Sequence, residues 1–113
     1  MKTTSLVVIL LLLVLSGCGA SVDVTKTAKG YYDNTDPNEV EILKTRPEKS
    51  YTELGTVTVT GFAANDTAKM HNAIRAKSAN LGATAVILTD EGMVKGGWGG
   101  LRRWATGVAI RYE

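Results

Sequence analysis

This chain contains few of the residues from which small exported domains and catalytic sites are usually built. Among its 113 residues there are one cysteine, one histidine, one phenylalanine and two prolines. A lone cysteine excludes an intramolecular disulfide framework, which needs cysteines in pairs. A lone histidine, His71, argues against a transition-metal site, which usually takes several His or Cys ligands, and it has no second group spaced for acid–base catalysis. We therefore expect no catalytic residue, no metal site, no cofactor and no enzymatic activity.

Excess charge of either sign is also lacking. Thirteen Lys and Arg residues stand against eleven Asp and Glu residues, which gives a formal net charge of +2 at pH 7. An excess this small does not create the long-range field that attracts polyanions. The composition therefore predicts no nucleic-acid partner.

The chain has one long apolar run, from Leu6 to Leu15. It is shorter than the ~20 residues of a transmembrane helix. Lys2 precedes it and two small residues follow it, which is the order of a secretory signal peptide. The only cysteine comes next, so that Leu15-Ser-Gly-Cys18 resembles the lipobox of bacterial lipoprotein precursors. The resemblance implies cleavage before Cys18 and a fatty-acylated thiol, with palmitate among the acyl groups. The alternative is an unmodified thiol behind an ordinary signal peptide.

This interpretation divides the chain into a signal peptide (1–17), an acylated tether (18–38) and a small domain (39–113). Loss of Lys2 with the signal peptide leaves twelve basic against eleven acidic residues. The tether is polar, and about twenty flexible residues have a root-mean-square span of roughly 25 Å. In the alternative that we keep open, Tyr31 and Tyr32 pack onto the domain and shorten the tether.

The anchor also predicts a location. Each buried methylene contributes ~0.8 kcal/mol to membrane binding, and stable attachment takes about two acyl chains, so a diacyl group on Cys18 would hold the domain at a membrane. Gly19, rather than Asp, follows the cysteine, which by analogy with enterobacterial lipoprotein sorting implies the outer membrane of a Gram-negative host. We therefore expect a lipid-anchored protein of the bacterial cell envelope, at the outer membrane and facing the periplasm.

Hydrophobic periodicity predicts four strands and one helix in the domain. A short strand covers Val40 to Leu43, and the alternation of Thr and Val over 54–62 is typical of a half-buried strand. An apolar stripe at helical spacing over 69–81 follows a candidate cap at Asn65 or Asp66 and ends at Gly82, where a left-handed residue is expected. The apolar run over 85–88 predicts a strand covered on both faces, and the last strand covers 103–112.

The order β-β-α-β-β indicates an α+β fold, a two-layer sandwich in which one helix covers a small sheet of about four strands. On the last strand, Ala105, Gly107 and Ala109 form a small-residue face that suits a closely packed helix. The opposite face of that strand is predicted to form either a satellite core under the tether, which we favour, or a contact surface; it consists of Trp104, Thr106, Val108, Ile110 and Tyr112.

Several of these segments resemble known envelope proteins. They are Tyr51 to Val57, the helix with Ala76, Ala79 and Leu81, Gly82 to Leu88, and Gly107 to Ile110. Together they are similar to the small lipoproteins related to the Rcs stress-sensor lipoprotein, and also to a cytoplasmic, nominally heavy-metal-binding family that forms ring oligomers. The sensor has disulfides in its globular domain, for which this chain has no cysteines. The resemblance thus implies an α+β fold on a lipid anchor, with envelope-stress sensing as the associated role.

The segment Lys95-Gly-Gly-Trp-Gly-Gly-Leu-Arg-Arg-Trp104 is the candidate binding site. Four glycines flank Trp98 and make the backbone permissive, while Trp and Arg are enriched at binding hot spots. The candidate partner-binding residues are Lys95, Trp98, Arg102 and Arg103. In the alternative, Trp98 folds back as a lid on the sheet and the arginines are simply solvated.

These observations favour a non-enzymatic, membrane-anchored envelope lipoprotein that acts as an interaction or stress-sensing module. Its partners would be the membrane, through the lipid on Cys18, and an envelope protein or cell-wall component. The alternative function is an oligomeric domain that binds a small ligand or a metal. The sequence leaves the oligomeric state open.

Overall fold

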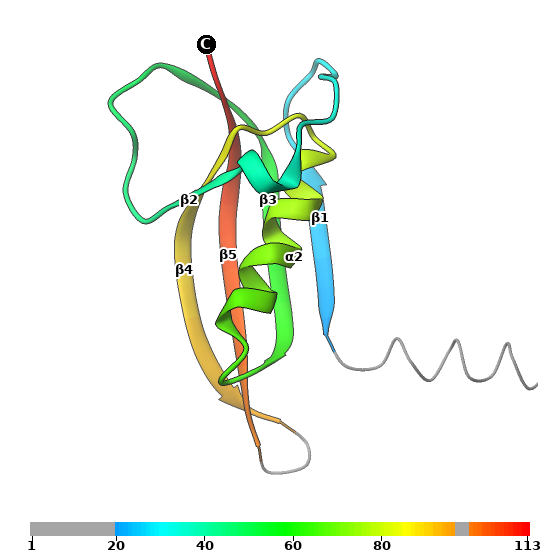
Figure 1. Ribbon diagram of the computed structural model, residues 1–113, viewed down its shortest axis with the longest axis vertical. Helices are drawn as coiled ribbons and strands as arrows, with labels where there is room; N and C mark the ends of the chain where they lie inside the picture. The colour runs from blue at the N-terminus through cyan, green and yellow to red at the C-terminus, as the bar shows by residue number, and fades with distance from the viewer. Residues whose placement is uncertain (1–19, 97–99) are drawn as a thin grey trace, which may run out of the picture.

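The described residues fold into one five-stranded mixed sheet with a single α-helix on one face (Figure 1). The computed structural model describes residues 20–96 and 100–113. In chain order the elements are β1 (Ser21–Lys26), the 3-10 turn η1 (Pro37–Glu39), β2 (Glu41–Leu43), β3 (Tyr51–Ala63), α2 (Thr67–Ala79), β4 (Ala85–Lys95) and β5 (Leu101–Tyr112). The predicted α+β class with one helix is therefore confirmed.

The strand order across the sheet is β1-β3-β5-β4-β2. Three of the four pairings are antiparallel, and only the short β2–β4 pairing is parallel. Since β3 and β4 both pair antiparallel with β5, they run parallel to each other, and α2 connects them across β5. Long non-local pairings thus make up most of the sheet.

The main core lies between α2 and the sheet. Val57 and Val59 of β3 are fully buried, and Thr58 between them points to the other face, as the alternation predicts. Met70 and Ile74, one turn apart on α2, are also fully buried. Burial of a side chain of this size contributes ~1.5–3 kcal/mol. The small-residue face of β5 lies on this side too, since Ala105 and Ala109 belong to the same cluster.

A second, smaller cluster lies on the opposite sheet face. Ala85, Ile87 and Ile110 are its buried members, so the β4 run is covered on both faces, as predicted. The expected satellite core exists, and its partly buried members include Val108 and Tyr112. Leu43 and Tyr51, which flank the connection between β2 and β3, also pack against this cluster. Within the connection, the Lys49 amine lies 5.1 Å from the centre of the Tyr112 ring. The prediction that the tether covers this cluster is wrong, because the tether segment Ser21–Lys26 pairs with β3 at the opposite edge of the sheet.

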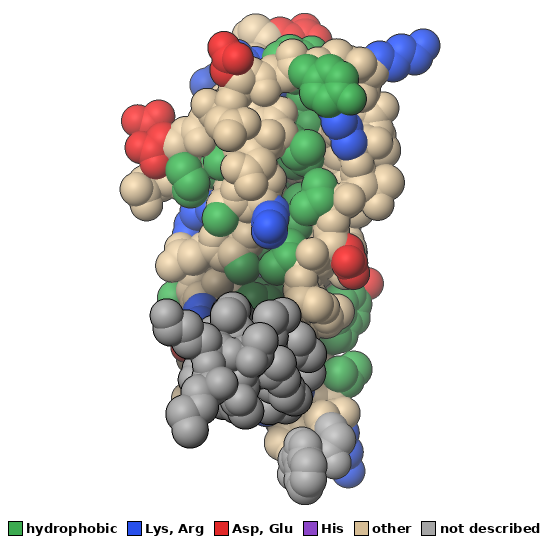
Figure 2. Space-filling model, turned by 90° about the vertical axis from the view of Figure 1, so that its right-hand side faces the viewer, with side chains coloured by type: hydrophobic (Ala, Val, Ile, Leu, Met, Phe, Trp, Pro, Cys, Tyr) green, Lys and Arg blue, Asp and Glu red, His purple; other side chains and the backbone are tan. Residues whose placement is uncertain are grey.

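The expectation of a free tether over 18–38 is wrong for its described part. Ser21–Lys26 form the edge strand β1, which pairs antiparallel with β3 along its whole length from Ser21 opposite Thr60 to Lys26 opposite Gly55. Val22 and Val24 point to the helix side, where Val22 packs against the main core. Viewed from the β1 edge, hydrophobic side chains follow a narrow strip along the molecule (Figure 2). The sheet therefore has five strands rather than four.

The chain after β1 continues across the end of the helix. Tyr32 lies against Gly82 and within 5.1 Å of the Arg111 guanidinium, whereas Tyr31 is 89% exposed. The Thr35 amide donates to the Ala79 carbonyl, the last residue of α2 (3.0 Å). Of the two tyrosines considered above, Tyr32 packs onto the domain.

The helix ends differ in how well they were predicted. Gly82 has a φ of +87°, which confirms the left-handed stop after α2. At the other end, Asp66 occupies the N-cap position but its side chain makes no capping hydrogen bond, so the predicted side-chain cap is wrong. The Met70 amide donates to the Asp66 carbonyl instead, which closes the first turn through the backbone.

Substitution of Gly82 should destabilise the fold. A Cβ at this position would lie 2.5 Å from the Cβ of Tyr32 and 2.9 Å from the Asp33 carbonyl oxygen, on a backbone that side chains rarely adopt. Gly82→Ala is expected to cost about 1–3 kcal/mol of unfolding free energy, measured by urea denaturation. Gly100→Ala is the control, since its added Cβ would meet nothing within 4 Å. Equal stability of the two variants would contradict this packing.

Candidate functional site: the end of the β4–β5 hairpin

The candidate site lies at the end of a long hairpin formed by β4 and β5. β2 pairs with β4 only as far as Ile87, and β4 then continues to Lys95, paired on its other side with β5. The Gly96 amide donates to the Gly100 carbonyl at the end of the hairpin (2.6 Å). The hairpin thus reaches beyond the last residues that β2 and α2 support, as Figure 1 shows.

The hairpin is longer than the sequence suggested. The sequence predicts a strand only over the apolar run 85–88, as the third of four expected strands. A register shift between Leu88 and Asp90 instead lets the strand continue, with Asp90 opposite Thr106 and Glu91 opposite Ala105. Consecutive residues of a strand point to opposite faces, so the two carboxylates diverge.

The structure separates the predicted binding residues. Arg102 and Arg103 follow each other in β5 and point to opposite faces, with Arg102 opposite Val94 and Arg103 opposite Met93. Arg103 donates from Nε to the Ala64 carbonyl in the β3–α2 connection, so this side chain ties the hairpin to the domain. Lys95 is exposed and pairs with Leu101. Two predicted site residues, Cys18 and Trp98, lie outside the described residues.

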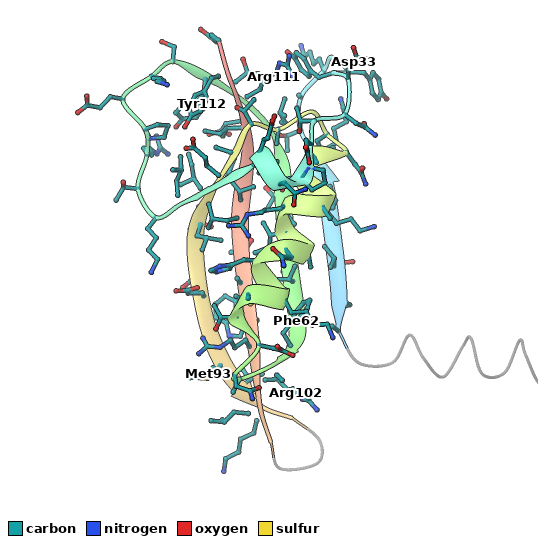
Figure 3. The ribbon with its side chains drawn as sticks, in the orientation of Figure 1. Asp33, Phe62, Met93, Arg102, Arg111 and Tyr112 are labelled. Atoms are coloured by element: carbon teal, nitrogen blue, oxygen red, sulfur yellow. The ribbon has the colours of Figure 1, made fainter. Side chains whose placement is uncertain are left out.

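Sequence reasoning missed three apolar side chains at this end. Met93, Val94 and Leu101 are 50%, 55% and 51% exposed, and none of them belongs to either core cluster. Figure 3 shows Met93 and Arg102 together at this end, below Phe62. The available signal was that valine, methionine and leucine stand beside bases in a segment that also contains four glycines. Their exposure is decided by the length of the hairpin, which the sequence does not reveal.

Trp104 lies further along the hairpin on the face away from α2. It stands opposite Gly92, where a Cβ would come within 2.9 Å of the indole Nε1. The absent side chain at Gly92 therefore provides the room in which the indole rests on the sheet. Beside it, the Thr58 and Thr106 hydroxyls form a hydrogen bond of 3.0 Å across β3 and β5. Trp104 is thus half-buried on a polar sheet face rather than part of the satellite core.

An open pocket of about 280 Å³ lies where β2 leaves β4. Its lining contains no histidine, cysteine or serine, and it consists of Lys44, Leu88, Thr89, Asp90 and Glu91. Within residues 20–96 and 100–113, no three His, Cys, Asp or Glu side chains gather in a way that could hold a metal ion. The polar groups of the pocket can accept hydrogen bonds or hold a solvated cation, but they do not set a nucleophile against a base.

The histidine lies on α2 close to this pocket. Burial lowers the pKa of His71 below its ordinary value of 6.5, and the positive charge of Arg75 acts in the same direction. Glu91 opposes this effect, while Lys44 and Arg103 add to it. Arg75 is itself held by the Val40 carbonyl, to which its Nε donates (3.1 Å). The neutral imidazole is therefore the stable form at neutral pH.

The comparisons with known proteins bear on the fold. No family model matches the chain, and no curated protein matches it. Among solved structures, it is similar to the crystal structure of the Francisella virulence factor FvfA in the orthorhombic form, with a TM-score of 0.56 and 11% identity. The match covers 80% of this chain and 97% of FvfA. At this identity the likeness shows a shared α+β fold alone, and the similarity to the Rcs lipoproteins stays a prediction.

In the two described ranges, α2 is neither long nor apolar enough to cross a bilayer, and no other helix qualifies.

The environment of His71 can be tested by titration. An NMR titration should give a midpoint below 6.5, and Arg75→Gln should raise it, with circular dichroism as the check on folding. Because folding disfavours the protonated imidazole, the unfolding free energy should be constant above the unfolded pKa and should fall as the pH drops through it towards the folded pKa. His71→Gln should abolish this fall. A wild-type midpoint at or above 6.5 would show that the imidazole is not in this environment.

Proposed function

We propose that this protein is a non-enzymatic envelope lipoprotein, held on a membrane by acyl groups at Cys18, whose small domain binds a partner close to the lipid surface. The observation that carries the proposal is the run Leu6–Leu15 followed by Leu15-Ser-Gly-Cys18. Signal peptide, small residues and cysteine occur in the order that lipoprotein processing requires. Two acyl chains would then be enough for stable attachment.

The position of β1 supports this assignment. Ser21, the first residue of β1, is only three residues after Cys18. Three extended residues span at most ~10 Å, whereas the flexible tether expected from the sequence would span roughly 25 Å. An anchor on Cys18 would therefore hold the sheet within about 10 Å of the membrane.

The domain fits a binding role better than a catalytic one. Its described pocket is open, and the pKa of its one histidine is lowered by burial. Exposed apolar and basic side chains gather at the hairpin end. Exposed apolar groups rimmed by charge are typical of interaction surfaces. The resemblance to the Rcs stress-sensor lipoproteins adds envelope-stress sensing as the role that such a module would serve.

The anchor can be tested by replacing the cysteine. In cells fed with labelled palmitate, the wild-type protein should incorporate label and float with membranes in a density gradient, whereas Cys18→Ala should do neither, because the thiol is the attachment point. Thr27→Ala, at an exposed position just after β1, should behave like the wild type. A wild-type protein that is unlabelled and remains in the soluble fraction would contradict the proposal.

A further inference from the structure

We propose that the end of the β4–β5 hairpin is a second membrane contact, which enters the headgroup layer of the same membrane that holds the lipid on Cys18. We define the hairpin end as Met93–Lys95 and Leu101–Arg103. The inference rests on the proposed anchor, and it adds the surface, the partner and the orientation of the domain. The partner is an anionic phospholipid surface.

The strand directions place the start of β1 and the hairpin end at the same end of the sheet. β1 and β5 are both antiparallel to β3, so they run parallel to each other and start at the same end of the sheet. Ser21 stands opposite Thr60, and further along β3 Ala63 stands opposite Arg102. Figure 1 shows the start of β1 and the hairpin at the lower end, opposite the C-terminus.

The length of the chain between Cys18 and Ser21 would allow the anchor to reach the level of the hairpin end. On β3, Thr60 lies between Val59, which faces Ala105, and Phe62, which faces Arg103, so Ser21 is roughly level with Trp104. From that level Leu101 is three residues further along β5, which is about 10 Å at the rise of a strand. Cys18 is three residues from Ser21 and can extend at most ~10 Å in the same direction. Acyl chains on Cys18 would thus place Leu101 at the membrane surface.

The chemistry of the hairpin end suits a lipid surface. Met93, Val94 and Leu101 are each about half exposed and belong to neither core cluster. They are three of the six exposed large hydrophobic side chains among the described residues. From Gly92 to Ala105 the sequence contains Lys95, two arginines and no acidic residue. Apolar side chains that enter the interface beside bases are the usual composition of an interfacial anchor. Each base close to an anionic surface contributes about 1 kcal/mol in favour of binding.

This second contact would fix the orientation of the domain. A single acylated residue leaves a domain free to rotate about its anchor, whereas two contacts at one end hold the strands upright on the membrane. The pocket beside β2 and the β2–β3 connection would then lie further from the lipid than the hairpin does. These are the surfaces that remain accessible to an envelope partner.

Environment-sensitive labels on the acylated full-length protein provide the test. Acylation blocks the only native thiol, so Val94→Cys introduces a single labelling site at the hairpin end, and Ser50→Cys introduces one at the opposite end, where β3 begins. Both proteins are placed in vesicles of phosphatidylethanolamine and phosphatidylglycerol that contain a nitroxide-labelled lipid. The label at position 94 should be quenched and blue-shifted, and the label at position 50 should be neither. Adding Lys95→Gln or Arg102→Gln should lower the ratio of lipid-bound to unbound hairpin, read from the quenching at position 94, by about fivefold for each charge removed. High salt should also lower this ratio.

The outcomes separate this inference from the anchor. Flotation of both labelled proteins with vesicles, with no quenching at position 94, would leave the anchor intact and overturn the second contact. If the label at position 94 is blue-shifted without lipid quenching, and light scattering shows a dimer, the hairpin end binds a second copy of the chain. That result would also overturn the proposed membrane contact. Failure of the proteins to float would contradict the anchor itself.

Discussion

The antiparallel pairing of β1 with β3 is the constraint on which the rest of the account depends. It turns a polar segment next to Cys18 into the edge of the sheet, from Ser21 opposite Thr60 to Lys26 opposite Gly55. The backbone ladder holds this segment, since most of its side chains are exposed and only Val22 packs against the main core. If Cys18 is acylated, the same pairing determines which end of the domain faces the lipid.

The two faces of the sheet differ in how much apolar surface they bury. The helix side buries the main core and supplies most of the stability, through fully buried side chains such as Met70 and Val57. The opposite face has a small cluster near the C-terminal end of β5 and a polar surface with Trp104 and the paired threonines further along. The hairpin continues beyond both cores, so its end is free of the packing that would fix its composition. The apolar side chains at this end are therefore available for the proposed membrane contact.

Much of the fold could be predicted from the sequence because its signals are local. The alternation of threonine and valine in β3, the helical spacing of Met70 and Ile74, and the left-handed Gly82 each depend on neighbours in the chain. β1 could not be predicted in the same way. It offers only Val22 and Val24 in a polar segment, and the backbone hydrogen bonds that hold an edge strand leave no side-chain pattern.

The candidate site was predictable in part for a related reason. The glycines and bases around residue 98 marked the hairpin end, yet nothing in the sequence showed that Arg102 and Arg103 point to opposite faces, because that depends on where the strand begins. The continuation of β4 past Asp90 depends on a register shift that reverses the alternation. From the sequence, Met93 and Leu101 could equally have been core residues, since methionine and leucine occur both in buried cores and on exposed binding surfaces.

If Cys18 is acylated, only Gly19 and Ala20 separate the anchor from the first strand of the sheet. Neutron reflectometry of the acylated protein on a supported bilayer measures the distance between headgroups and protein directly. The protein layer should begin at the headgroups, with no water layer between them. A water-filled gap approaching the roughly 25 Å of a flexible tether of about twenty residues would contradict it.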